Sequence, residues 1–263
     1  MPTFQEVGFL SEELDQFRVN VRIAHEAVFR IADLINRTAM RMLWDLPGVG
    51  LNEPRAYFVA AFARSVQAFQ GIILMSERGA EAEARSLVRS LAETVFLAVG
   101  MFRVADMVAR LHEDNARHRQ GIANRMIELN RARDPNFDAT RFEQELAEVV
   151  AEYPNGPNSI NWSWLANAVG LVPLYEAAYR FTSGDAAHAT LQSLNRHMAA
   201  NDQGELHEFV FNPSADDIRR TFRPAVVGMF NLMDAARTEL GLDAYRADIA
   251  YIGLEIQFFR EHI

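Results

Sequence analysis

The sequence contains neither cysteine nor lysine: among its 263 residues, all 26 basic side chains are arginine. Without cysteine there is no disulfide, no thiolate nucleophile and no cysteine-ligated zinc. Without lysine there is no Schiff-base chemistry, no ordinary attachment of pyridoxal phosphate and no Walker-type phosphate loop. A compositional bias of the source genome explains the missing lysine more simply than function does. The two absences exclude several reaction classes and indicate no compartment.

Excess positive charge is also missing, since the net charge is −9 and the pI is near 5.3. Such a chain has no general attraction for nucleic acid or for an anionic membrane, so RNA binding would require a local patch of arginine. The charge-free stretch 156–175 contains two prolines and several amides, which excludes a membrane span there. Residues 1–6 lack the basic start of a signal peptide. We therefore expect a cytoplasmic protein with no membrane contact.

Helical periodicity covers almost every long segment. The expected helices are 11–46, 52–78, 80–102, 104–133, 138–152, 161–169, 173–182, 185–200, 214–240 and 242–261. Only Glu208–Phe211 has the character of a strand, and no repeat of 20 to 50 residues occurs. We predict an all-α protein, a single helical bundle of about nine to ten helices in one domain spanning 1–263. A boundary in the loop near 154–160 is the alternative.

One helical pattern breaks at Ser183-Gly184 and restarts on Asp185, with His188 one turn further on. An aspartate at a helix start accepts backbone N–H bonds, and a histidine three residues later lies on the same face. The carboxylate would fix the tautomer of the imidazole and raise its pKa, as in a general base or a metal ligand. These residues form either a site or a corner that holds two helices together.

A second group of polar residues, Arg85, Arg89 and Glu93, repeats every four positions and so lies along one side of a helix. The row flanks an apolar arc and continues into residues 94–102, which are apolar all round. We therefore expect Arg89 and Glu93 to be half-buried, where a charge must be paired. The alternative is an ordinary ion pair at the margin of the core, which contributes little if exposed.

No metal or cofactor is expected. A di-metal carboxylate bundle needs two Glu-x-x-His units, and the chain has none. His112 and His118 are too far apart for the zinc-protease motif, in which the histidines are four positions apart. Ser183 lies near His188, but the Gly-x-Ser-x-Gly motif of a hydrolase nucleophile is missing. No glycine-rich loop follows a strand, so Rossmann-type nucleotide binding is not supported.

Helical ribonucleases of the HEPN superfamily use an arginine, four to six intervening residues and a histidine. Arg180 and His188 are separated by seven residues and miss this spacing, whereas Arg18 and His25 are separated by six and fit it. With this many arginines and histidines, about two such matches arise by chance. The fit therefore has little weight.

The order of several motifs resembles an uncharacterised bacterial family of helical domains of unknown function, over about residues 84–200. The matching residues are Arg89-Ser90-Leu91-Ala92-Glu93, Trp162 or Trp164, Tyr175, Tyr179-Arg180, Ser183 and His188. The chain departs from the family after the histidine, where Ala189 stands in place of a frequent proline. The resemblance implies an all-α fold and a polar cluster that joins Arg89, Glu93, Ser183 and His188 across two helices. The helical build is also similar to that of HEPN-type nucleases of bacterial conflict systems, by analogy alone.

Two hypotheses for function follow. In the first, the protein cleaves RNA without a metal: His188 acts as general base or acid, Arg89 and Arg180 hold phosphate, and Glu93 and Asp185 orient these groups. In the second, the same residues form a buried network in a non-catalytic scaffold or interaction module. A homodimer is a further hypothesis, because helical bundles with exposed apolar helices often pair.

Overall fold

The computed structural model describes residues 2–48, 50–180, 190–201 and 203–262, with backbone alone at 180, 192 and 260–262. Across these residues it contains twelve α-helices and one small sheet, which confirms the predicted all-α fold. The α-helices are α1 (Phe4–Val7), α2 (Leu14–Ala24), α3 (Glu26–Asp45), α4 (Glu53–Glu77), α5 (Glu81–Arg103), α6 (Met107–Arg133), α7 (Thr140–Glu152), α8 (Trp162–Ala168), α9 (Val172–Leu174), α10 (Leu191–Asn195), α11 (Ile218–Leu240) and α12 (Arg246–His262). Between them lie the 3-10 helices η1 (Gly8–Leu10) and η4 (Asp243–Tyr245), the π-helix η2 (Tyr175–Arg180) and the strands β1 (Met198–Ala200) and β2 (Leu206–Phe209).

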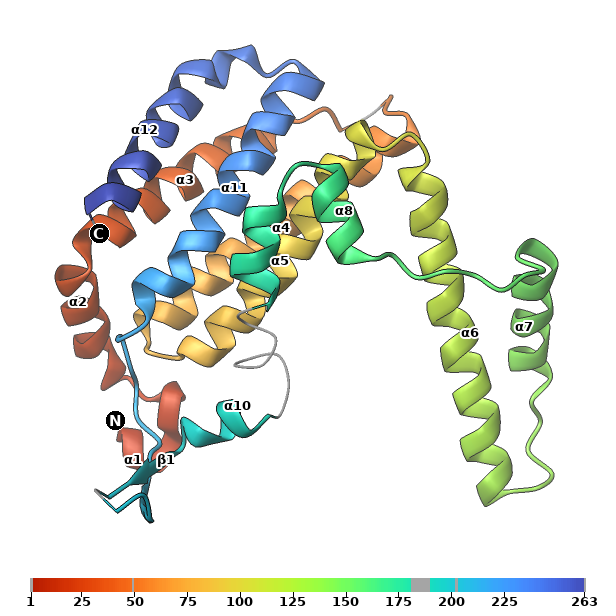
Figure 1. The fold of residues 1–263 in the computed structure, drawn as a ribbon, viewed down its shortest axis with the longest axis horizontal. Coiled ribbons are helices and arrows are strands. Elements are labelled where there is room, and N and C mark those ends of the chain that lie inside the picture. The colour runs from red at the N-terminus through yellow and green to blue at the C-terminus, as the bar shows by residue number, and fades with distance from the viewer. Residues whose placement is uncertain (1, 49, 181–189, 202, 263) are drawn as a thin grey trace.

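The body of the molecule is a bundle formed by α3, α4, α5, α11 and α12 (Figure 1). The helices α4 and α5 form an antiparallel hairpin, α11 packs against α3, α4 and α5, and α12 covers α3 and α11. Large side chains fill the space between them: Phe58, Phe62, Phe69, Phe96 and Phe222 are fully buried. Such close packing of aromatic and aliphatic side chains is the main source of stability in a bundle.

Within the described residues, α4 is the one helix whose length and apolar composition would allow it to cross a membrane. Length and composition are weak signs, because the central helix of a bundle has the same properties. Here α4 lies against α3, α5 and α11, and its phenylalanines belong to the core. Its start is fixed by Asn52, whose side chain accepts a bond from the N–H of Arg55, and by Pro54 in the first turn.

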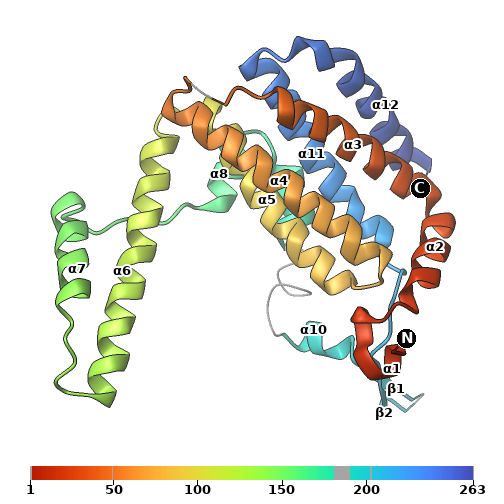
Figure 2. The ribbon, with the colours of Figure 1, turned by 180° about the vertical axis from the view of Figure 1, so that it is seen from behind.

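Helices α6 and α7 form an antiparallel hairpin that stands away from the body in both views, and we call it the arm (Figures 1 and 2). In α6, which has 27 residues, only Met107, Ala116 and Ala123 are buried. The chain returns to the body through residues 153–161, which α6 tethers: Glu113 accepts a 2.9 Å bond from the N–H of Asn158, and Asp114 accepts a 2.8 Å bond from that of Ile160.

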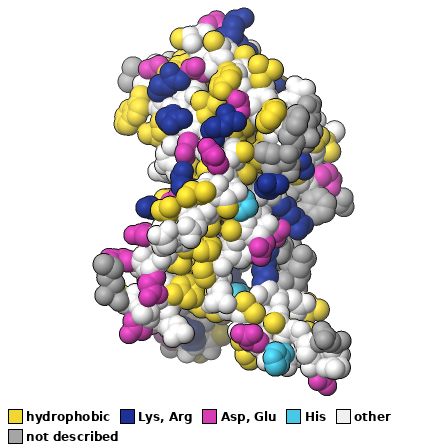
Figure 3. Space-filling view, turned by 90° about the vertical axis from the view of Figure 1, so that its left-hand side faces the viewer, with side chains coloured by type: hydrophobic (Ala, Val, Ile, Leu, Met, Phe, Trp, Pro, Cys, Tyr) yellow, Lys and Arg dark blue, Asp and Glu magenta, His cyan; other side chains and the backbone are white. Residues whose placement is uncertain are grey.

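The outer face of the body mixes apolar and charged side chains, as seen from the side on which α2, α3 and α12 lie (Figure 3). Tyr251, Leu254 and Phe258 of α12 are at least half exposed, at 50%, 66% and 52%. Ion pairs lie beside them, because Arg30 of α3 contacts Glu255 at 2.7 Å and Arg41 contacts Asp248 at 2.6 Å. The α3–α12 contact therefore combines an apolar core with exposed charge pairs.

The expected helix over 11–46 is two helices, broken at His25, whose φ and ψ are −119° and 35°. The break is invisible in the apolar pattern, because Leu14, Val21 and Val28 keep a seven-residue spacing across it and all three are buried. A single non-helical residue turns the chain and leaves the period of the buried face intact.

The expected helix over 185–200 is confirmed only in part where the structure describes it. Residues 185–189 lie outside the described part, α10 covers only Leu191–Asn195, and Met198–Ala200 is a strand. This strand pairs antiparallel with β2, with Met198 opposite Phe209. The partner strand supplies hydrogen bonds that the local sequence does not reveal, and it includes Glu208 from the segment with strand character.

Candidate functional site

Arg85 is the first residue of the row Arg85, Arg89 and Glu93 on α5, and it is the most deeply buried of the three. Its side chain is only 3% exposed and forms an ion pair with Asp217, and its Nε donates to Thr221 Oγ1 at 3.2 Å. Glu81, one turn earlier, accepts a 2.8 Å bond from the N–H of Asp217. Burial raises the pKa of the Glu81 carboxyl, which the hydrogen bond from Asp217 opposes. Arg85 therefore ties α5 to the start of α11 and is a structural residue.

One turn further along α5, the guanidinium of Arg89 joins α5 to η2. Its Nε donates to Glu93 Oε1 at 3.2 Å, its Nη2 donates to the Tyr179 hydroxyl at 3.0 Å, and its carbon lies 4.2 Å above the Tyr179 ring. The side chains of Arg89 and Glu93 are 18% and 27% exposed, which confirms the expected half-burial. We call Arg89, Glu93, Tyr175 and Tyr179 the Arg89 cluster.

The π-helix η2 positions the tyrosines of this cluster. Tyr175 and Tyr179 stack with their ring centres 4.9 Å apart and their planes 15° apart, and Tyr175 in turn lies 6.4 Å from Phe96 of the core. Ala178 is fully buried, and η2 packs against both α5 and α11. A π-helical turn is rare and is frequently found at functional sites. The stacking of Tyr179 on Tyr175, and the contact of Tyr175 with Phe96, hold the Tyr179 ring at the position where Arg89 contacts it.

The structure thus brings together two of the six predicted site residues, Arg89 and Glu93, and adds Tyr179. The backbone of Arg180 ends η2, so this residue follows directly on the cluster. Ser183, Asp185 and His188 lie outside the described residues. Their participation in the site remains a prediction.

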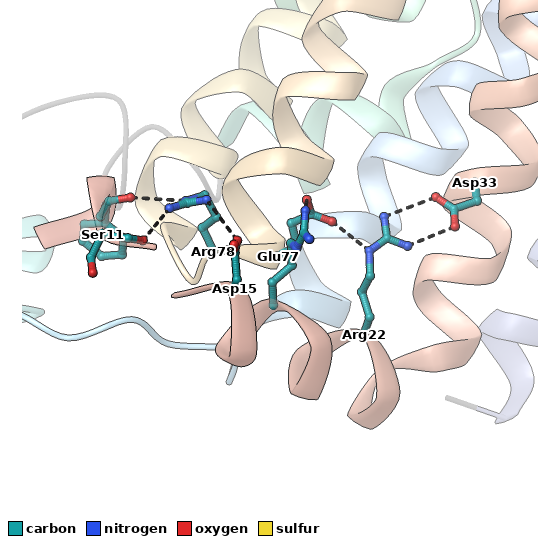
Figure 4. A network of polar contacts seen from close by, with 8 residues as sticks. Ser11, Asp15, Arg22, Asp33, Glu77 and Arg78 are labelled. Carbon is teal, nitrogen blue, oxygen red and sulfur yellow. Dashed lines mark hydrogen bonds and ion pairs between the residues drawn. The ribbon is translucent and has the colours of Figure 1, made fainter. Parts of the chain in front are cut away.

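A second polar network, which the sequence did not indicate, joins α2 and α3 to the end of α4 (Figure 4). Glu77 is buried, and its carboxylate accepts a 2.8 Å bond from Arg22 Nε and lies 3.9 Å from Arg18. Arg22 also contacts Asp33 at 3.0 Å. Arg78 donates to the carbonyl oxygen of Ser11 at 2.9 Å. Because the partners are separated by 11 to 67 positions, no short motif could have revealed the network.

The Arg18–His25 pair, which fits the HEPN spacing, lies beside this network. Arg18 is directed toward Glu77. Among the described residues, Nδ1 of His25 is buried without a hydrogen-bond partner, and burial together with Arg219 lowers the pKa of the imidazole. An imidazole whose Nδ1 makes no hydrogen bond lacks the group that commonly orients a catalytic histidine. The spacing match therefore gains no support from its surroundings.

Three hollows lie along α6. The largest, of about 730 Å³, lies between the first turns of α6 and the segment that leaves α7, and its lining includes Asp106, Arg110, His112, Glu113 and Tyr153. His112 Nε2 is 2.9 Å from Glu53 Oε1 on α4. Within the described part of the chain, no group of three or more histidine, aspartate and glutamate side chains is arranged to hold a metal ion. This hollow is open and rich in acidic groups, so it does not suit an RNA phosphate.

The helical bundle with its half-buried arginine cluster places the protein in the all-α class. The chain belongs to the Family of unknown function (DUF5677), which matches residues 55–205, more than half of its length. The match begins in α4 and includes α5, the arm, η2 and β1, so it contains the whole Arg89 cluster. The expected membership of an uncharacterised family is confirmed. Comparison with curated proteins and with solved structures gave no match.

Proposed function

We propose that the Arg89 cluster is one half of a site that cleaves RNA without a metal and that His188 belongs to the other half. The observation that supports this is the contact between Arg89 and Tyr179, because η2 leads directly into the segment that contains His188. Two stretches of chain about ninety residues apart thus meet at an arginine. Such convergence is what a site built from several elements requires.

In this proposal Arg89 binds the scissile phosphate. An arginine offers a planar fork of donors that matches two phosphate oxygens. Glu93 and Tyr179 hold this plane in one orientation, through the bonds to Nε and Nη2 and through the ring beneath it. A donor that is fixed before the reaction stabilises the developing negative charge without reorganisation. Arg180, the next residue along the chain after Tyr179, would add a second positive charge.

His188 acts as the general base. It removes the proton from a ribose 2′-hydroxyl, the 2′-oxygen attacks the neighbouring phosphorus, and the bond from phosphorus to the 5′-oxygen breaks. The departing oxygen takes up a proton, and the products are a 2′,3′-cyclic phosphate and a 5′-hydroxyl. Asp185 orients the imidazole, as a carboxylate commonly does for a catalytic histidine. Proton transfer of this kind contributes about 10²- to 10⁴-fold to a rate.

The test measures cleavage of a labelled single-stranded RNA by the purified full chain. We expect His188→Ala to lower the rate at least about a hundredfold, while His118→Ala, which changes an exposed histidine of the arm, leaves it unchanged. Tyr179→Phe removes the hydroxyl that accepts from Arg89 and should lower the rate less than His188→Ala. A His188→Ala protein that cleaves RNA as fast as its parent would contradict the proposal that His188 is the general base.

The alternative is a non-catalytic scaffold, and one observation favours it: Nε and Nη2 of Arg89 already bond inside the chain. The cluster would then hold η2 against α5. This alternative predicts that Glu93→Ala and His188→Ala each lower the melting temperature by several degrees, as a loss of about 1 kcal/mol would. Unchanged melting together with lost cleavage supports the enzyme, and the reverse pattern supports the scaffold.

A further inference from the structure

His25 is the single non-helical residue at the corner between α2 and α3, and its backbone bonds to both helices. Its N–H donates to the carbonyl oxygen of Val21 at 2.9 Å, which ends α2. Its own carbonyl oxygen accepts bonds from the N–H groups of Val28 at 3.0 Å and Phe29 at 3.2 Å, which begin α3. The conformation of this one residue therefore sets the angle between the two helices.

The imidazole of His25 faces the start of α11. The residue as a whole is partly exposed, but its Nδ1 is buried and has no hydrogen-bond partner among the described residues. Two charged groups act on the ring from this side: Arg219 in the first turn of α11 and Asp216 just before that helix. Burial together with Arg219 lowers the pKa of the imidazole, and Asp216 opposes this shift.

The charged groups on α2, α3 and α4 near this corner are engaged with one another. Arg22, one turn before His25, donates to Glu77 of α4 at 2.8 Å and to Asp33 of α3 at 3.0 Å (Figure 4). Arg18 lies 3.9 Å from the same glutamate. These ion pairs hold α2 against its neighbours without using the imidazole. The state of the ring therefore acts separately from them.

We propose that His25 is a pH-sensitive switch, which keeps α2 packed on the bundle while its ring is neutral and lets α2 open when the ring takes up a proton. In the neutral ring one nitrogen carries the proton, and Nε2 takes it because Nδ1 has no acceptor. A second proton must go to Nδ1, where it becomes a buried N–H donor without a partner on a charged ring. This state is unfavourable, and Arg219 repels the added charge. Opening the corner exposes Nδ1 to water and removes both penalties.

Helix α2 is the side of the corner that opens, because it is the more weakly packed. It buries only Leu14 and Val21 of its 11 residues, whereas α3 buries eight of its 20. A segment with few buried contacts opens at a lower free energy than the whole protein unfolds. We therefore expect acid to loosen α2 while α3 and the rest of the bundle stay folded.

The direction of the pH effect follows from the two states of the ring. An imidazole exposed by opening regains its ordinary pKa of 6.5, whereas the packed imidazole has a lower pKa. The packed corner therefore has its full stability above pH 6.5 and loses stability as the pH falls below 6.5 towards the pKa of the packed ring.

The experiment measures hydrogen exchange of the full chain at about pH 7.5 and about pH 5, with each amide corrected for its intrinsic rate. We expect the amides of α2 to exchange about three- to tenfold faster at the lower pH after this correction, while those of α5 are unchanged. His25→Gln stays neutral at both pH values and should remove the difference. His118→Gln, which changes an exposed histidine of the arm, should keep it.

Two variants on the opposite side of the contact leave the backbone of the corner intact. Arg219→Gln removes the repelling charge, so it should raise the pKa of His25 and reduce the acid effect on α2. Asp216→Asn removes the opposing carboxylate, so it should lower that pKa and enlarge the effect. Both side chains are exposed, so neither substitution disturbs the core. Titration of the His25 ring by NMR measures the pKa directly.

Three results would overturn the proposal. The first is a pKa of 6.5 or higher for His25 in the folded chain. The second is exchange in α2 that does not quicken at the lower pH. The third is equal quickening in the parent and in His25→Gln, which would assign the acid response to the carboxylates around Arg22. None of these results depends on whether the protein cleaves RNA.

Discussion

The body and the arm are built from helices of similar length that are stabilised in different ways. Helix α4 has 25 residues and buries ten of them, including three phenylalanines, whereas α6 has 27 residues and buries three. The body thus rests on many large apolar side chains, whereas the arm buries only a few side chains, such as Ala116, Ala123 and Val149, and adds partly exposed ion pairs. Surface ion pairs contribute about 0–1 kcal/mol each, so the arm opens locally at a lower free energy than the body unfolds.

The largest effect is expected when a phenylalanine is replaced by alanine in each of the two regions. Phe62→Ala in the body removes a fully buried ring and should lower the free energy of unfolding by about 3–5 kcal/mol. Phe142→Ala in the arm removes a half-buried ring that stacks on Phe137 at 6.3 Å, and should cost about 1 kcal/mol. Urea unfolding measures both. Equal losses would show that the arm and the body share one core.

Carboxylates in the two regions give a second comparison. Glu77→Ala leaves Arg22 and Arg18 without their buried partner and should destabilise by about 3 kcal/mol or less, because breaking a buried pair costs about 3–5 kcal/mol and these arginines are partly exposed. Glu143→Ala breaks an exposed pair of the arm and should cost about 0–1 kcal/mol. Thermal unfolding of Glu77→Gln, which keeps the shape of the side chain and removes its charge, separates the loss of charge from the loss of packing. A Glu77 variant as stable as Glu143→Ala would contradict the comparison.

Only part of this contrast could be predicted from the sequence. Capping and periodicity placed α4, α5, α6 and α7, because Asn52 with Pro54 marks a helix start locally. The break at His25 was missed because the apolar period continues through it. The β1 strand was missed because its hydrogen-bond partners lie further along the chain. The arm was seen as a charged helix, and its separation from the body is a property of tertiary packing.

The candidate site divides in the same way. The Arg89–Glu93 pair is four residues apart on one helix, so spacing alone predicted it. The contact of Arg89 with Tyr179 spans ninety positions, and the sequence did not indicate it, because the family resemblance implied only a cluster of Arg89 with Glu93, Ser183 and His188. The network around Glu77 has neither a local spacing nor a motif. Distance along the chain therefore decided what sequence reasoning could find.

Alkaline pH should weaken the body through Tyr245. Burial, together with a bond to Asp45 Oδ2 at 2.5 Å, raises the pKa of the Tyr245 hydroxyl from 10.0 to about 12. In the unfolded chain the phenol ionises near pH 10, while in the folded chain it stays neutral. The stabilisation is complete below pH 10 and is lost as the pH rises from 10 to about 12. Across this range the free energy of unfolding should fall less steeply with pH for Tyr245→Phe than for the parent protein. Identical slopes would show that folding does not raise the pKa of the Tyr245 hydroxyl.

The smallest expected effect concerns the arm alone. Arg119 contacts Glu145 at 2.8 Å and Glu148 at 3.4 Å, all partly exposed, so Arg119→Ala should change global stability by about 0.5 kcal/mol. Hydrogen exchange should nevertheless quicken in α7, because local opening needs only these contacts to break. High salt should quicken the same amides in the parent protein, since it screens exposed pairs. Arg117→Ala, two residues away and bonded to Gln120 alone at 3.4 Å among the described residues, is the matched control. If α7 exchanges no faster in Arg119→Ala than in Arg117→Ala, apolar contacts rather than ion pairs hold the arm together.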